Sequence, residues 1–154
     1  MPDESLLTDE VRALAGKETP IGSVEVTPRA WRHAVEVYTG VVPQSTPAAG
    51  EPISGYVIAA LDADYAVESL PALLPNSILI SNEWQFERPM RMGETFQAAY
   101  RLVDITERFG GRFGYSIDFR AEVFYRDANG EVVARSGRTM TQYDPADARE
   151  TAAS

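Results

Sequence analysis

The sequence predicts an α+β fold in which one antiparallel sheet wraps around a long buried helix. Two observations carry this prediction. From residue 77 to residue 143, apolar and polar residues alternate with a period of two, as expected for strands with one buried face. Just before them, residues 54–70 begin with an almost uninterrupted apolar run, which is typical of a helix buried on all sides. Because a one-sided sheet needs a covering layer, we expect this helix to lie across its concave face.

The composition is that of an ordinary globular domain. The chain has 154 residues, of which 44% are hydrophobic, and it has no cysteine. A net charge of −9 argues against nucleic acid as a partner, because phosphate contacts require a basic surface. No apolar run approaches the ~20 residues of a membrane span, and the acidic N-terminus does not resemble a signal peptide. We therefore expect a cytoplasmic protein without membrane contact, with residues 1–143 as one domain and 144–154 as a disordered tail.

The first elements are predicted to be a short helix and a strand. Leu7, Val11 and Leu14 have helical spacing, and Gly16 is a suitable residue to end the helix. Residues 21–26 (IGSVEV) are typical of a short strand.

A second helix follows Thr27 and Pro28, a hydroxyl N-cap with proline at the first helical position. Gly40 marks its end. Its apolar stripe consists of Trp31, Ala34, Val35 and Tyr38. Residues 41–52 form a loop without periodicity, and loops of this length are often functional.

Four strands are predicted after the long helix, in consecutive order. Residues 92–94 turn the first strand into the second, and the glycine-rich residues 109–114 connect the second to the third. Asn129-Gly130 predicts a hairpin of type I′ between the last two strands. The predicted apolar face of the first strand consists of Ile78, Ile80, Trp84 and Phe86.

Several segments, taken in this order, resemble the MaoC-like dehydratases, which have the hot-dog fold. They are Leu14–Lys17, the helix VTPRAWRHAVEVYTG, the segment FERPMRMGE at residues 86–94, and the turn segment GEVVAR at residues 130–135. The resemblance covers roughly residues 12–143 and is strongest to the N-terminal-domain branch. That branch holds the fatty-acid-synthase-type dehydratases and the mycobacterial hydroxyacyl dehydratase subunits.

The resemblance implies the reversible hydration of an enoyl thioester carried on coenzyme A or acyl carrier protein, a reaction of fatty acid metabolism. Active members carry a Gly-Asp-x-Asn-Pro-x-His segment after the first helix, whose Asp and His act as general acid and base. Here Gly40 is followed by Val41, no histidine follows Pro43, and the single histidine, His33, lies upstream inside the helix. The dyad is therefore missing, and we predict no catalytic residue, no metal and no cofactor.

The preferred hypothesis is thus a substrate-binding subunit of a heteromeric hydratase or dehydratase, paired with a hot-dog subunit that bears the dyad. A homodimer with its own chemistry, such as a thioesterase or divergent hydratase using Asp62, Asp64 or Glu68, remains an alternative. The second alternative is a protein that binds an apolar ligand without turning it over.

We predict five substrate-binding residues: Ser54, Gly55, Tyr56, Trp84 and Arg88. Ser54 and Gly55 open the long helix, so their backbone N–H groups could face a thioester carbonyl, although an ordinary N-cap explains Ser54 as well. Trp84 lies on the apolar parity of its strand, where its indole N–H needs a partner such as Asn82. Arg88 could reach a pyrophosphate or simply pair with a neighbouring acid.

Overall fold

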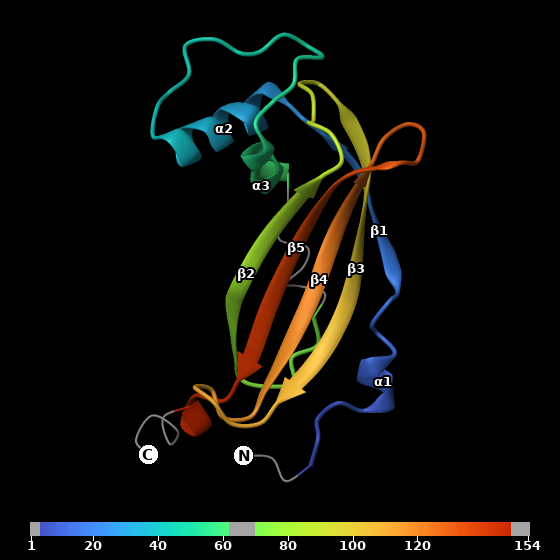
Figure 1. The fold of residues 1–154 in the computed structure, drawn as a ribbon, viewed down its shortest axis with the longest axis vertical. Coiled ribbons are helices and arrows are strands. Elements are labelled where there is room, and N and C mark those ends of the chain that lie inside the picture. The colour runs from blue at the N-terminus through green and yellow to red at the C-terminus, as the bar shows by residue number, and fades with distance from the viewer. Residues whose placement is uncertain (1–3, 62–69, 149–154) are drawn as a thin grey trace.

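The computed structural model describes residues 4–61 and 70–148 and confirms the predicted α+β class (Figure 1). One antiparallel sheet contains five strands in the order β1-β3-β4-β5-β2. The strands are β1 (Glu18–Glu25), β2 (Asn76–Phe86), β3 (Thr95–Arg108), β4 (Ser116–Arg126) and β5 (Val132–Tyr143). The helices are α1 (Asp9–Arg12), α2 (Pro28–Thr39), the 3-10 helix η1 (Gly55–Val57) and α3 (Ile58–Leu61). α2 and α3 lie together at one end of the elongated sheet, and α1 lies towards the other end.

The four strands after residue 75 are consecutive in the chain but not in the sheet. β3, β4 and β5 pair in order, whereas β2 pairs with β5 and forms an edge. The place beside β3 is taken by the N-terminal strand β1. The prediction that residues 92–94 turn the chain from β2 directly into a neighbouring strand is therefore wrong. Residues 87–94 can instead cross the end of the sheet, because eight residues reach up to about 26 Å and three strand spacings need only about 14 Å.

A β-bulge distributes the apolar residues of β2 over both faces of the sheet. The register against β5 shifts between Leu79 and Ser81, which leaves Ile80 as the extra residue. One extra residue reverses the alternation, so Ile78 lies on the opposite face from Trp84. The prediction that Ile78 shares an apolar face with Trp84 is therefore wrong. Ile78, Leu79 and Ile80 are all exposed, by 41%, 50% and 48%.

The hydrophobic core lies on the inner face of the sheet, where alternate residues of β3 and β4 are buried as predicted. Its largest fully buried side chains include Phe96, Tyr115, Ile117, Phe119 and Tyr125. Val57 of η1 and Ile58 of α3 are 0% exposed and belong to the same core cluster. The start of the predicted long helix is therefore buried in the core. Its continuation, with Asp62, Asp64 and Glu68, lies outside the described residues.

Gln142 holds the chain just before β2 onto the sheet. Its buried side chain accepts hydrogen bonds from the N–H groups of Leu73 (2.9 Å) and Leu74 (3.2 Å) and donates one to the carbonyl of Pro71 (2.8 Å). These backbone groups belong to no helix or strand, so they need a side-chain partner.

α2 begins and ends where the sequence predicted. The hydroxyl of Thr27 accepts a hydrogen bond from the N–H of Ala30 at 3.1 Å, and Gly40 ends the helix with a φ of +70°. α1 is shorter than predicted and is capped by Thr8, and the chain continues in turns as far as Gly16. No helix in the described ranges is both long and apolar enough to cross a membrane.

The loop from α2 to η1 is held in place at its C-terminal end. Gly50 N–H donates to the carbonyl of Met92, Met92 N–H to Glu51, and Ile53 N–H to Met90, each at 2.9 Å. These bonds join residues 50–53 to the segment between β2 and β3. Residues 41–49 therefore form the part of the loop without such a ladder.

The hairpin between β4 and β5 is present, but its turn is not of type I′. That type needs a positive φ at both central residues, whereas only Gly130, at +80°, has one. Asp127 organises the turn, because its carboxylate accepts from the N–H groups of Asn129 (2.9 Å) and Glu131 (3.1 Å).

The chain after β5 is not disordered at its start, contrary to the prediction. Residues 145–148 form one helical turn, and the carboxylate of Asp144 caps it by accepting from the N–H of Ala146 at 2.9 Å. The turn packs closely on Gly114, where an added Cβ would lie 3.0 Å from the Cβ of Asp147. Residues 149–154 lie outside the described residues.

Candidate functional site

The candidate site is a groove between α2 and the short helices η1 and α3, which pack against it. Two adjoining hollows of about 320 and 340 Å³ form this α2–α3 groove and share His33 and Ala60. The first is lined by His33, Ala34, Val37, Tyr38, Ala59 and Ala60, and the second by Thr27, Arg29, Ala30, His33 and Ala60. Mostly apolar walls with a few polar groups suit an elongated apolar ligand with a polar head.

Three aromatic rings gather at one end of the groove. Tyr38 of α2 stacks on Tyr56 of η1, with ring centroids 5.1 Å apart and planes inclined by 19°. Trp84 of β2 meets Tyr38 edge-on, with centroids 6.0 Å apart. We call these three residues the aromatic cluster. It joins two helices to the edge strand of the sheet at the point where the groove ends.

The indole nitrogen of Trp84 is a buried donor without a partner in the part of the chain that the structure describes. Asn82, the partner expected from the sequence, does not supply the acceptor. Native proteins leave few buried donors unpaired, because a lost hydrogen bond is costly inside a protein. Among the described residues, the hydrogen-bonding capacity of this N–H group is therefore unused.

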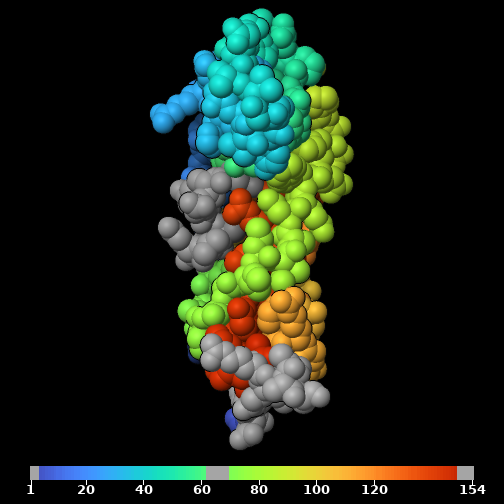
Figure 2. All heavy atoms as spheres, turned by 90° about the vertical axis from the view of Figure 1, so that its left-hand side faces the viewer, coloured from blue at the N-terminus to red at the C-terminus, as the bar shows by residue number. Residues whose placement is uncertain are grey.

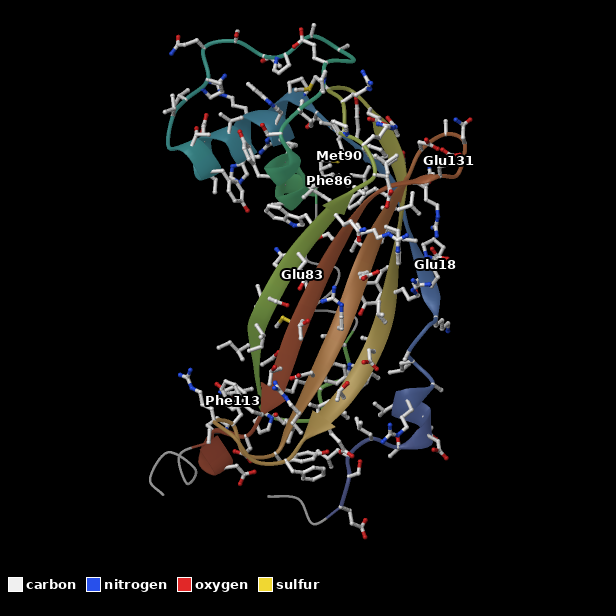
Figure 3. The ribbon with its side chains drawn as sticks, viewed as in Figure 1. Glu18, Glu83, Phe86, Met90, Phe113 and Glu131 are labelled. Carbon is white, nitrogen blue, oxygen red and sulfur yellow. The ribbon has the colours of Figure 1, made fainter. Side chains whose placement is uncertain are left out.

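Ser54 and Gly55 stand at the start of η1, as predicted. Ser54 is exposed, occupies the N-cap position, and makes no side-chain capping bond. Gly55 lies against the ring of Phe86, and a Cβ there would come within 2.8 Å of the ring atom Cε2. Figure 3 shows Phe86 at the end of β2, beneath α3. Close packing on this ring explains the glycine without any ligand.

Arg88 is bound within its own segment. Its guanidinium group forms a two-pronged ion pair with Glu94, in which Nη1 donates to Oε2 at 3.1 Å and Nη2 donates to Oε1. Asp127 lies farther away, at 4.0 Å. The hydrogen bonds that Arg88 donates to Glu94 raise the pKa of Arg88 above its ordinary value, although burial acts against this. Of the two expected roles, the geometry favours pairing with a neighbouring acid.

The single histidine of the sequence lies beside the groove. His33 is exposed on α2 and lines the groove, while Val41 is 62% exposed in the loop that follows. Within the described ranges, no three His, Asp or Glu side chains are placed to hold a metal ion.

The structure brings four of the five predicted binding residues together. Tyr56 and Trp84 belong to the aromatic cluster, and Ser54 and Gly55 adjoin it in η1. Arg88 instead joins Glu94. Sequence reasoning missed the part played by Tyr38, which it assigned to the apolar stripe of α2. The signal available in the sequence was the position of Tyr38 in the last turn of α2.

Comparisons with known proteins find similar proteins by structure alone. No family model matches the sequence, and no curated protein matches it. A MaoC-like dehydratase from Rhodospirillum rubrum is 16% identical, with a TM-score of 0.55, over 84% of this chain and 92% of that one. The C-terminally truncated HadBC (3R-hydroxyacyl-ACP dehydratase) complex from Mycobacterium tuberculosis is 14% identical, with a TM-score of 0.54, over 83% and 96%.

A hot-dog-like protein from Thermanaerovibrio acidaminovorans gives a similar result, with 14% identity and a TM-score of 0.53 over 88% of this chain and 87% of that one. At such low identities the likeness concerns the fold. The chain therefore has the hot-dog fold found in MaoC-like dehydratases, as the sequence predicted.

Proposed function

We propose that this hot-dog protein belongs to the acyl-thioester hydratases and dehydratases and acts as the subunit that binds substrate without supplying the catalytic pair. One observation carries the proposal: Val41 follows Gly40 where active members have aspartate, and the only histidine lies upstream at position 33. Hydration of an enoyl thioester needs a positioned acid and base. A chain with this fold but without that pair needs a partner for the chemistry.

The α2–α3 groove is the proposed place for the acyl thioester. Its alanine-rich walls suit an acyl chain or pantetheine arm, and Arg29 lines one of its hollows, where it could meet a phosphate. At the aromatic cluster, the N–H of Trp84, which has no partner among the described residues, could donate to the thioester carbonyl. Coenzyme A and acyl carrier protein offer the same pantetheine thioester, so either carrier fits.

The partner is proposed to be a second hot-dog subunit that bears the Asp–His pair. The edge strand β2 presents the exposed side chains of Ile78, Leu79 and Ile80, and in Figure 2 this strand faces the viewer. An unprotected edge strand can pair with a strand of another chain. The HadBC neighbour is itself described as a complex, which supports this view.

A homodimer with its own chemistry is the second candidate, because His33 lines the groove rather than facing away from it. An imidazole beside bound substrate could act as a base without the usual aspartate. Replacing His33 by alanine separates the two proposals.

The test is enoyl-thioester hydration, followed by loss of absorbance of the conjugated thioester, with short, medium and branched acyl groups. We expect no turnover by the pure chain and turnover after reconstitution with a dyad-bearing hot-dog subunit. Turnover by the chain alone that is abolished in His33→Ala would contradict the proposal and support the homodimeric enzyme. Tight binding of an enoyl thioester without turnover under any pairing would indicate a binding protein instead.

A further inference from the structure

The outer face of the sheet, opposite the core, gathers three arginines around one phenylalanine. Phe124 of β4 is only 3% exposed, yet it does not belong to the core cluster. The guanidinium carbon of Arg101 lies 4.6 Å from the centre of its ring, that of Arg135 5.2 Å and that of Arg126 5.7 Å. The arginines come from β3, β5 and β4, so they cover the ring from three adjacent strands. We call these four residues the arginine roof.

Two arginines of this face, one of them in the roof, are paired with carboxylates. Arg120 lies 3.0 Å from Glu83 and 3.8 Å from Glu122. Arg126, at the margin of the roof, pairs with Glu18 at 2.5 Å. Glu18 and Glu83 stand on the two opposite edge strands, β1 and β2 (Figure 3). These ion pairs therefore run across the sheet and occupy three of its acidic side chains.

Arg101 and Arg135 differ, because neither has a carboxylate within 4.0 Å in the described part of the chain. Arg101 is opposite Glu18 and Glu122 in the strand register, but both acids are held by other arginines. The Nε atom of Arg135 is buried and has no hydrogen-bond acceptor among the residues that the structure describes. Among the described residues, two arginines thus lie over one phenylalanine ring with no ion pair of their own.

A guanidinium group that lies with its face over a ring can keep its recognition edge available. Its N–H groups lie in the guanidinium plane, so a group held against a ring by its face can still bind an oxyanion with two parallel hydrogen bonds. Because both groups rest on one ring, their positions are fixed before any partner arrives. An anion placed over the roof would relieve the repulsion between the three cations.

From this geometry we propose that the arginine roof docks a partner protein through paired carboxylates on an acidic segment. The roof lies on an open sheet face and not in one of the hollows described above, so a small ion would be little enclosed. A nucleic acid would extend beyond the roof and be repelled by the rest of the protein surface, because the chain has a net charge of −9. A short acidic segment instead reaches only the local positive patch. The site lies on the face opposite the core and does not depend on the proposed function.

The test uses an acetylated decaglutamate peptide and the intact chain labelled with ¹⁵N. We expect saturable shifts of the Nε–H signals of Arg101 and Arg135, and a Kd at least tenfold tighter for the natural chain than for the double variant Arg101→Gln/Arg135→Gln. A matched control, Arg112→Gln/Arg32→Gln, removes the same charge elsewhere and should bind like the natural chain. Equal binding by all three proteins, or no binding, would overturn the proposal.

Two further measurements keep the test decisive. If the glutamine variant fails to fold, Arg101→Lys/Arg135→Lys keeps both charges and loses the planar fork, so we expect binding weakened at least threefold. Undiminished binding by the lysine variant would count against recognition by the fork. Tighter binding of inorganic pyrophosphate or of a single-stranded oligonucleotide at the same signals would assign the roof to a different anion and overturn the proposal.

Discussion

At the scale of single residues, Gly55 and Phe86 fix how close η1 comes to the sheet. The ring of Phe86 occupies the space in which a side chain at position 55 would begin, and the nearest ring atom would lie 2.8 Å from an added Cβ. Gly55 has no positive φ, so its backbone conformation does not require glycine. Steric contact alone accounts for the residue.

Gly55→Ala should therefore destabilise the chain by about 1–2 kcal/mol, because overpacking outweighs the better helix propensity of alanine. Urea unfolding measures the change. In the matched double variant Gly55→Ala/Phe86→Leu, the shorter side chain should remove most of the added cost, so the two substitutions would not be additive. An unchanged midpoint in Gly55→Ala would mean that the ring moves aside freely.

At the scale of elements, a single side chain of β5 fixes the segment before β2. Residues 71–74 form no ladder with the sheet, and three of their backbone groups bond to Gln142. Gln142 is 5% exposed, so water cannot replace it without opening the structure. The path by which the chain enters β2 thus depends on one amide.

Gln142→Met keeps the length of the side chain and removes all three hydrogen bonds. We expect a loss of about 1–3 kcal/mol, because partly buried backbone groups would be left unpaired. Hydrogen exchange of the Leu73 and Leu74 amides should accelerate in parallel. The control Gln85→Met, at an exposed position of β2, should change neither quantity. Equal effects of both substitutions would show that the bonds contribute nothing specific.

The N-terminal segment is joined to β3 by a second set of hydrogen bonds. Glu107 accepts from the hydroxyl of Tyr115 at 2.7 Å and from that of Ser5 at 2.8 Å, while the N–H of Leu6 donates to the Tyr115 oxygen at 3.1 Å. The hydrogen bonds from Tyr115 and Ser5 lower the pKa of Glu107 below its ordinary value. Burial raises the pKa of Tyr115.

This shift predicts a pH-dependent attachment of the N-terminus. A carboxyl group whose pKa is lower in the folded state stabilises that state above its unfolded pKa, and this contribution is lost as pH falls through the folded pKa. The natural chain should exceed Glu107→Gln in stability by about 1 kcal/mol or less near neutrality, since the group is partly exposed. The difference should vanish in acid. Amide exchange of Leu6 across the pH range measures it, and a pH-independent difference would contradict the mechanism.

At the scale of the whole molecule, the two edges of the sheet differ in how open they are to another chain. β1 contains Pro20 and an irregularity beside Gly22, both of which discourage strand pairing. β2 has no proline and exposes three successive apolar side chains, Ile78 to Ile80. Association through β2 would bury them, and association through β1 would not.

We therefore expect the isolated chain, of 16.9 kDa, to associate in pairs through β2. Ile78→Glu/Leu79→Glu should yield monomers in sedimentation equilibrium, because two charges would be buried at the contact. Val103→Glu, which adds charge at an exposed apolar position of β3, serves as control and should leave the pairs intact. Pairs that survive the double substitution would exclude this edge as the interface.

The sequence predicted those features that local rules determine. Helix α2 follows from Thr27 and Gly40, and the buried strands follow from alternation in β3 and β4. Strand order was missed because pairing of β2 with β5 joins distant segments. The bulge at Ile80 carries no distinctive residue, so Ile78 was assigned to the wrong face. Similarly, Trp84 was predicted for the site, but its contact with Tyr38 depends on how α2 packs.

Because only the C-terminal end of the α2–η1 loop is held by main-chain bonds, the two ends of the loop should differ in how well they accept an insertion. Residues 50–53 are held by main-chain bonds to Met90 and Met92, whereas residues 41–49 lie between this anchor and the end of α2. The entropy cost of lengthening a flexible loop grows only logarithmically, by about 0.6 kcal/mol for each doubling. A peptide tag inserted after Gln44 should thus leave the melting temperature nearly unchanged. The same tag inserted after Glu51 would separate the bonded residues and unfold the groove.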